Sequence, residues 1–150
     1  MSLLHQLMLF FFMITSFSQE LASGFYIIYK PPKKTPCEKE LRMLVRQAKV
    51  CISKKPIINI EELDYITEIQ YDPNSKKNYV DIGISSAGIQ ILNKAANSLP
   101  DTKFALVLQD DVICIFSIKE EIGIRYIRIG EDAELKDLIL VHDALSKAKF

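Results

Sequence analysis

Histidine and cysteine are scarce in this sequence, which limits the metal chemistry open to it. The two histidines are His5 and His142, and the cysteines Cys37, Cys51 and Cys114 lie far apart along the chain. Because a zinc site needs three or four such ligands, we expect no metal and no cofactor. His142 falls on the apolar side of a predicted helix, which is typical of a structural histidine.

An excess of charge of either sign is also lacking, since 19 basic residues balance 19 acidic ones. Proteins that bind nucleic acid normally carry a basic excess or stripe, so we expect no nucleic-acid partner. The phosphate-binding patterns GxGxxG and GxxxxGK[ST] are absent, and so is the GxSxG pattern of serine hydrolases. These absences favour a protein that is not an enzyme.

Charged side chains are missing from residues 1–18, MSLLHQLMLFFFMITSFS, although this segment has an unbroken apolar run at 7–14. Small residues, Ser16 and Ser18, stand at positions −3 and −1 of a cut before Gln19. This layout predicts a signal peptide over residues 1–18. The alternative is a membrane anchor, but the run is shorter than the roughly 20 residues that a spanning helix needs. We therefore expect a periplasmic or secreted mature chain, 19–150, forming one domain without a membrane span.

Export permits disulfides, but three cysteines cannot all pair. Residues 38–48 place Leu41, Leu44, Val45 and Ala48 at helical spacing. A helix of that length holds its ends about 16 Å apart, whereas a disulfide needs Cα atoms within about 7 Å. The pair Cys37–Cys51 is thus disfavoured. Cys114, in an apolar strand, is expected to be a buried free thiol, with a bridge to Cys51 as the alternative.

The remaining patterns predict an α+β fold. Alternating or β-branched runs predict strands over residues 24–30, 50–53, 65–71, 78–84, 103–108, 112–117 and 122–129. The run 122–129 is apolar on both faces, which suggests a central strand. Two further helices are predicted, one capped by Ser85 and closed by Pro100, the other capped by Asp132, with its apolar side formed by Leu135, Leu138, Ile139, His142 and Leu145. Helices separated by hairpins favour one antiparallel sheet with helices on one face, a ferredoxin-like two-layer sandwich.

Asp110 and Asp111 stand between two apolar runs, in ALVLQDDVICIF. They fit either a catalytic carboxylate pair or a tight turn. Aspartate favours turns, and adjacent strand residues point to opposite faces and so do not converge on one substrate atom. We therefore predict a hairpin whose turn exposes both aspartates.

Several short motifs in order resemble the head subdomain of the first periplasmic domain of SecD, a subunit of the bacterial protein-export machinery. They are PII at 56–58, YDP at 71–73, VDIGISSAG at 80–88, FALVL at 104–108 and DDVI at 110–113. The sequence departs from SecD at Gln109-Asp110, where SecD has Asp-Gly, and at Cys114-Ile115-Phe116, where it has Ser-Ala-Pro. The multi-helix membrane part of SecD has no counterpart, so the resemblance implies a stand-alone exported head domain.

The resemblance implies a binding module that holds polypeptide or an envelope protein. An antiparallel sheet with one free face or edge can take an extended peptide by strand addition. The aromatic residues on predicted strands are the candidate binding residues: Tyr65, Tyr71, Tyr79 and Phe116. Two other hypotheses remain open. One is a small secreted hydrolase or hydrolase inhibitor that uses an aspartate with His142, and the other is a structural component of an envelope complex.

Overall fold

The fold is taken from a computed structural model that describes residues 21–31, 36–37, 39–46, 48–118, 123, 125–130 and 133–150. The predicted signal peptide and the predicted helix cap Asp132 lie outside the described residues. In the described part of the chain, no helix is both long enough and apolar enough to cross a membrane.

The larger of two sheets, the large sheet, has six strands in the order β3-β2-β9-β8-β1-β4. Its strands are antiparallel neighbours except for β2 and β9, which run parallel. Their bounds are β1 (Gly24–Ile28), β2 (Glu40–Met43), β3 (Lys49–Cys51), β4 (Ile58–Asn59), β8 (Lys103–Leu108) and β9 (Asp111–Ser117). The central hairpin β8–β9 turns at Gln109 and Asp110, both with positive φ, which confirms the predicted turn. Only Asp110 is exposed as predicted, because Asp111 is the first residue of β9 and is half-buried.

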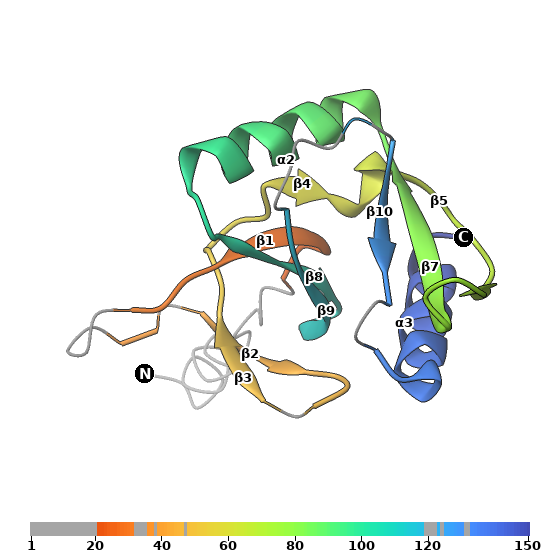
Figure 1. The fold of residues 1–150 in the computed structure, drawn as a ribbon. Coiled ribbons are helices and arrows are strands. Elements are labelled where there is room, and N and C mark those ends of the chain that lie inside the picture. Colours follow the sequence, from red (N-terminus) through yellow and green to blue (C-terminus); the bar gives the residue numbers. More distant parts are fainter. Residues whose placement is uncertain are drawn as a thin grey trace, which may run out of the picture.

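The small sheet has four antiparallel strands, with β7 at its centre. β10 pairs with one edge of β7, and β5 and β6 pair in succession with the other edge (Figure 1). The bounds are β5 (Leu63–Ile66), β6 (Gln70–Asp72), β7 (Lys77–Ile84) and β10 (Tyr126–Ile129). The β6–β7 hairpin closes through the predicted turn, where the Asp72 carboxylate accepts from the Asn74 N–H and the Ser75 hydroxyl.

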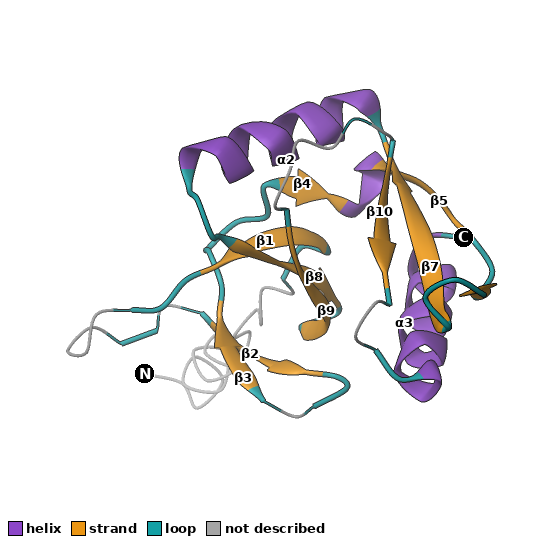
Figure 2. Cartoon of the chain, in the orientation of Figure 1, coloured by secondary structure: helices purple, strands orange, loops and turns teal. Residues whose placement is uncertain are grey.

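Within the described residues, two helices and one 3-10 turn accompany the sheets (Figure 2). α2 (Ser86–Ser98) begins at its predicted cap, since the Ser85 hydroxyl accepts from the Gly88 N–H at 3.0 Å. The same hydroxyl donates to Glu62 in η1 (Ile60–Glu62). α3 (Leu135–Lys149) ends with the Lys149 ammonium donating to the carbonyls of Ile60 and Glu61. Both helices are therefore tied to the short η1 segment.

The core forms two clusters, one on each face of the large sheet. The first joins this sheet to the small sheet and both helices, and includes Phe25, Phe104, Leu106, Val80, Ile82, Ile84, Leu92, Leu138 and Leu145. The second lies on the opposite face and consists of Tyr26, Leu41, Ile52, Ala105, Val107 and Val112. Alternate residues of β8 thus enter different clusters, as the period of a strand buried on both faces requires.

The α+β class is confirmed, but the single sheet is not. The strands divide between two sheets, and a ferredoxin-like topology is not confirmed. The prediction of a central strand at 122–129 is wrong for its described part, because among the described strands β10 pairs only with β7 and lies at the edge of its sheet. Ile127 and Ile129 face the core, whereas Tyr126 and Arg128 face outward. The apolar side of α3 also differs from the prediction, since Val141 is buried while Leu135 and Ile139 are exposed.

The predicted helix over residues 38–48 is wrong. Its described residues form the β2–β3 hairpin, in which Leu41 pairs with Val50 and the Met43 N–H donates to Ala48 O. This hairpin brings the Cα atoms of Cys37 and Cys51 to 5.7 Å, and the two cysteines form a disulfide. The Cys37–Cys51 disulfide, which the predicted helix would exclude, is therefore the one that forms. Cys114 is the buried free thiol that the sequence predicts.

Candidate functional site on the outer face of the small sheet

The small sheet buries one face and exposes the other. Along β7, Val80, Ile82 and Ile84 enter the core, so the residues between them lie on the opposite side. Their partners on β5 and β10 share that side, because directly paired residues point to the same face. We call this surface the outer face, and it is formed by Tyr65, Tyr79, Asp81, Gly83, Tyr126 and Arg128.

A two-pronged ion pair lies at the centre of the outer face. Arg128 Nε donates to Asp81 Oδ1 at 2.8 Å and Arg128 Nη2 donates to Asp81 Oδ2 at 2.9 Å. The two residues are direct cross-strand partners. The Asp81 side chain is 10% exposed and that of Arg128 is 39% exposed. Donation to the carboxylate raises the pKa of the Arg128 guanidinium above its ordinary value, so the guanidinium stays charged beside Asp81.

Aromatic rings hold the Arg128 guanidinium in place. Its carbon Cζ lies 3.8 Å from the centroid of the Tyr79 ring and 5.7 Å from that of Tyr126, within the range of a cation–π contact. The Tyr79 hydroxyl donates to the side-chain oxygen of Gln70 on β6 at 2.8 Å. The arginine, the tyrosines, the aspartate and Gln70 therefore form one connected layer across β10, β7 and β6.

Tyr65 extends this layer to the β5 side. It pairs directly with Gly83, and a Cβ added to Gly83 would overlap the Tyr65 ring. The ring therefore lies over the glycine, in space that the side chain of any other residue would fill. Tyr65 is 42% exposed, so the layer presents an accessible aromatic surface.

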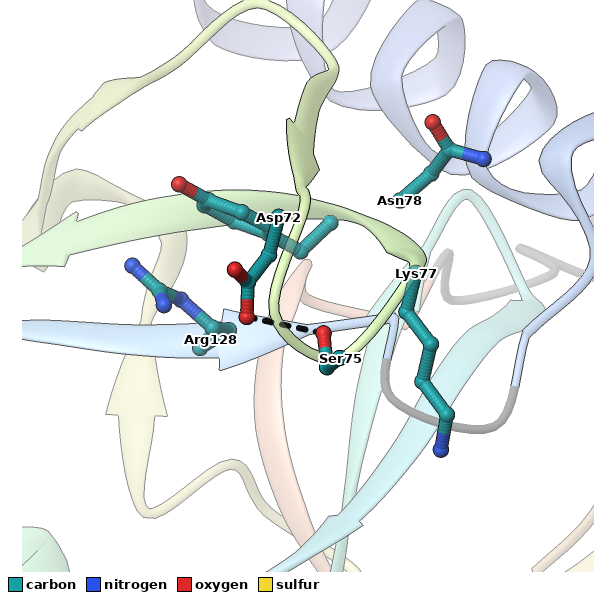
Figure 3. A pocket seen from close by; sticks show the side chains of 6 residues that line it. Asp72, Ser75, Lys77, Asn78 and Arg128 are labelled. Atoms are coloured by element: carbon teal, nitrogen blue, oxygen red, sulfur yellow. Dashed lines mark hydrogen bonds between the residues drawn. The ribbon is translucent and has the colours of Figure 1, made fainter.

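A shallow recess of about 300 Å³ borders the outer face near the β6–β7 turn (Figure 3). It is lined by Asp72, Ser75, Lys77, Asn78, Tyr79 and Arg128. The N–H of Asn74 and the Ser75 hydroxyl donate to the Asp72 carboxylate and lower the pKa of Asp72, with a smaller effect from the Arg128 charge. Figure 3 shows the Lys77 and Asn78 side chains directed away from Asp72 and Arg128.

The structure brings together two of the four predicted binding residues. Tyr65 and Tyr79 both belong to the outer face. Tyr71 is 58% exposed but pairs with Asn78, so it lies on the other side of the β6–β7 ribbon. Phe116 is on β9, where its ring meets Phe25 edge-on with 5.3 Å between centroids and stacks on Phe104 at 5.6 Å.

Sequence reasoning missed Arg128 and Asp81. Arg128 is one polar residue in an apolar run, and Asp81 lies on a strand 47 residues earlier. Only the pairing of β7 with β10 joins them, and no local pattern predicts that pairing. The sequence did offer one signal for this ion pair: an arginine and an aspartate each interrupt an apolar run.

The other residues considered in the sequence analysis, Asp110, His142 and Cys114, lie away from the outer face. The exposed Asp110 carboxylate accepts from the Leu21 N–H at 3.2 Å. His142 lies on α3, with its ring nitrogens 3.8 Å from Glu68 and 3.7 Å from Asp143. Burial raises the pKa of the Cys114 thiol to about 12. No three acidic, histidine or cysteine side chains gather as metal ligands within the described residues.

Comparison with known proteins gives a fold likeness only. No family model and no curated protein matches the chain. A solved structure of SecDF, a membrane component that enhances protein export, matches with a TM-score of 0.56 and 12% identity, over 97% of this chain and 68% of that chain. SecDF in its super-membrane-facing form matches with a TM-score of 0.54 and 13% identity, over 84% of this chain and 18% of that one. The chain thus shares a fold with the periplasmic region of SecDF.

The disulfide and the fold both give information about the cellular compartment of the protein. Disulfides persist mainly outside the reducing cytosol, and the Cys37–Cys51 bridge closes the β2–β3 hairpin. Both features are consistent with an extracytoplasmic location.

Proposed function

We propose that this protein is an extracytoplasmic, non-enzymatic module, similar to the head subdomain of the first periplasmic domain of SecD, that binds polypeptide weakly and reversibly. The observation that carries the proposal is the likeness to SecDF, which extends over 97% of the chain. Because that likeness is one of fold, the binding role itself has to be measured.

Physical features of the outer face support a role in binding. It combines the exposed Tyr65 ring and the half-buried rings of Tyr79 and Tyr126 with an arginine whose charge is compensated by Asp81. Such a surface offers apolar contact and hydrogen bonds without strong selection by charge. A module that accepts many polypeptide sequences needs that combination.

The direct test is a titration with a permanently unfolded polypeptide. The full-length gene is expressed so that the product is exported and oxidised. The purified protein is then added to a fluorescently labelled, reduced and carboxymethylated substrate protein. We expect a saturable rise in fluorescence anisotropy, and no rise with the same substrate in its native form. Absence of saturable binding, or equal binding of both forms, contradicts the proposal.

Variants connect this binding to the outer face. The double variant Tyr65→Ala, Tyr79→Ala is expected to weaken binding. Phe150→Ala removes an aromatic ring that is 52% exposed at the end of α3 and serves as the matched control. Tyr71→Ala shows whether the binding surface continues around the β6–β7 ribbon. If the double variant binds like the unaltered protein, the tyrosines are not the site.

Mass determination of the exported product tests the predicted export. A chain that begins at Gln19 is expected if residues 1–18 are a signal peptide. Retention of these residues in a membrane fraction would instead show an anchor.

A further inference from the structure

The main chain of β10 has one edge in the sheet and one edge without a strand partner in the described part of the chain. The Ile84 N–H donates to Arg125 O at 2.9 Å, and Tyr126 pairs with Gly83 in the next register position. Antiparallel pairs alternate between hydrogen-bonded and non-hydrogen-bonded. Main-chain groups of Ile127 and Ile129 therefore point to β7, and those of Tyr126 and Arg128 point away from it.

The other sheet edges carry features that oppose pairing with a further chain. On β3, the carbonyl of Cys51 accepts from the Tyr29 N–H at 3.1 Å, and its side chain is in the disulfide. β4 has only two residues and β6 only three. The register of β5 shifts between Leu63 and Tyr65. Short strands, irregular register and covering contacts are the usual protections of a sheet edge.

β10 lacks these protections along Tyr126–Ile129, which contains no proline, no lysine and no register shift. Its one charged residue, Arg128, is held on the outer face by Asp81 and by the Tyr79 ring. The arginine side chain is therefore fixed before any ligand arrives, and little side-chain entropy remains to be lost on binding. The edge is regular, preorganised and compensated in charge.

We propose that the edge of β10 is where an extended segment of non-native polypeptide adds as a further strand. This inference rests on the proposed function and locates its site. The N–H and C=O groups of Tyr126 and Arg128 supply the main-chain hydrogen bonds, which read no sequence. Side chains of the added strand point alternately to the two faces of the small sheet. One set lies beside Ile127 on the core side, and the other lies beside Tyr126 and Arg128 on the outer face. Segments that alternate apolar and polar residues therefore fit best.

A pair of synthetic peptides tests the mode of binding. One is a capped peptide of alternating valine and threonine, and the other has proline at its central position, which removes a main-chain donor. We expect the first to compete with the unfolded substrate and the second to compete about tenfold less well, the effect of one or two lost hydrogen bonds. Equal competition by both peptides overturns strand addition.

Amide hydrogen exchange on the unaltered protein locates the added strand. The amides of Tyr126 and Arg128 are expected to exchange quickly in the free protein and to become protected when the alternating peptide binds. The amides of Ile127 and Ile129 are expected to be protected in both states. Peptide binding with protection elsewhere overturns the site but leaves the proposed function standing, whereas absence of any binding to unfolded polypeptide removes the proposed function itself.

A proline variant with a matched control adds a second measurement. Tyr126→Pro removes an outward N–H from β10, and Lys49→Pro removes the corresponding outward N–H from the edge strand β3. We expect about tenfold weaker substrate binding for the first and unchanged binding for the second. A self-associated dimer that dissociates on Tyr126→Pro shows that a second copy of this chain occupies the edge, which overturns the proposal. If Tyr126→Pro does not fold, the exchange measurement decides.

Discussion

The two sheets differ in how many of their faces are buried. In the large sheet, Phe104 and Leu106 enter one core cluster, while Ala105 and Val107 enter the other. The small sheet buries the Val80 side of β7 and leaves Tyr65 and Arg128 exposed on its other side. A sheet covered on both faces contributes stability and has little surface left for a partner. The small sheet is where sequence can change for binding without loss of the main core.

The sharpest test of this contrast compares one aromatic residue from each sheet. Phe104→Ala removes a ring that is 0% exposed and is expected to lower the free energy of unfolding by about 3 to 5 kcal/mol. Tyr65→Ala, on the outer face, is expected to lower it by less than about 1 kcal/mol. Urea denaturation followed by circular dichroism measures both. Similar losses for the two variants would contradict the contrast.

Stability of the large sheet also depends on the disulfide at its β2–β3 end. Cys51→Ser opens a loop of sequence separation 14, for which chain-entropy arguments give about 3 kcal/mol. The same loss is expected when the unaltered protein is reduced. Cys114→Ala, which leaves the disulfide intact, is the control and should respond to reductant like the unaltered protein. A Cys51→Ser variant as stable as the unaltered protein would show that the hairpin holds without its bridge.

In the small sheet, the largest effect is expected at Gly130. Its φ is 135°, and an added Cβ would lie 2.5 Å from Asn78 O and 2.8 Å from Tyr79 Cα, both main-chain atoms of β7. Gly130→Ala is therefore expected to lower the free energy of unfolding by about 2 to 3 kcal/mol. Gly123→Ala meets no atom within 4 Å and should change it by less than about 0.5 kcal/mol. Equal effects would mean that β10 can move away from β7.

Asp81→Asn tests the ion pair of the outer face. It leaves the Arg128 charge without its partner but half accessible to water, so we expect a loss of about 1 to 2 kcal/mol. Near-ultraviolet circular dichroism should also change, because the guanidinium no longer holds its place over the Tyr79 ring. Lys49→Ala breaks a pair whose side chains are 62% and 46% exposed and is expected to matter by less than about 1 kcal/mol. An Asp81→Asn variant no less stable than Lys49→Ala would show that the pair contributes little.

The smallest effect is expected for Asp110→Asn. Asparagine keeps an oxygen that can accept from the Leu21 N–H and tolerates the φ of 69° at this position. We expect a change of less than about 0.5 kcal/mol and unchanged binding of unfolded polypeptide. Should the protein show hydrolytic activity that this substitution abolishes, the turn would be part of an active site and the hydrolase hypothesis would replace the proposed function.

Local patterns predicted most of the elements correctly. The Ser85 cap, the turn at Gln109 and Asp110, and the alternation along β7 depend on neighbours in sequence. Spacing failed at Leu41 and Val45, where helical periodicity competes with a hairpin that the Cys37–Cys51 bridge closes. A covalent link between distant positions outweighs the weak helix propensity of so short a segment.

Local sequence patterns could not predict the division into two sheets or the residues that form the candidate site. β2 joins the large sheet through a parallel pairing with β9, some 70 residues away along the chain. Arg128 meets Asp81 only because β10 pairs with β7. Phe116 has the aromatic character of a binding residue, but its position against Phe25 and Phe104 follows from how the sheets pack. These facts depend on long-range contacts, which a single sequence does not encode in any short window.

The buried state of Cys114 has a consequence for how the chain matures. Three thiols can close three different single bridges, and two of those bridges would use Cys114. Once the packing of the first core cluster buries this sulfur, its thiol is both inaccessible and protonated at neutral pH. Packing of this cluster before oxidation would therefore leave Cys37–Cys51 as the one bridge that can form.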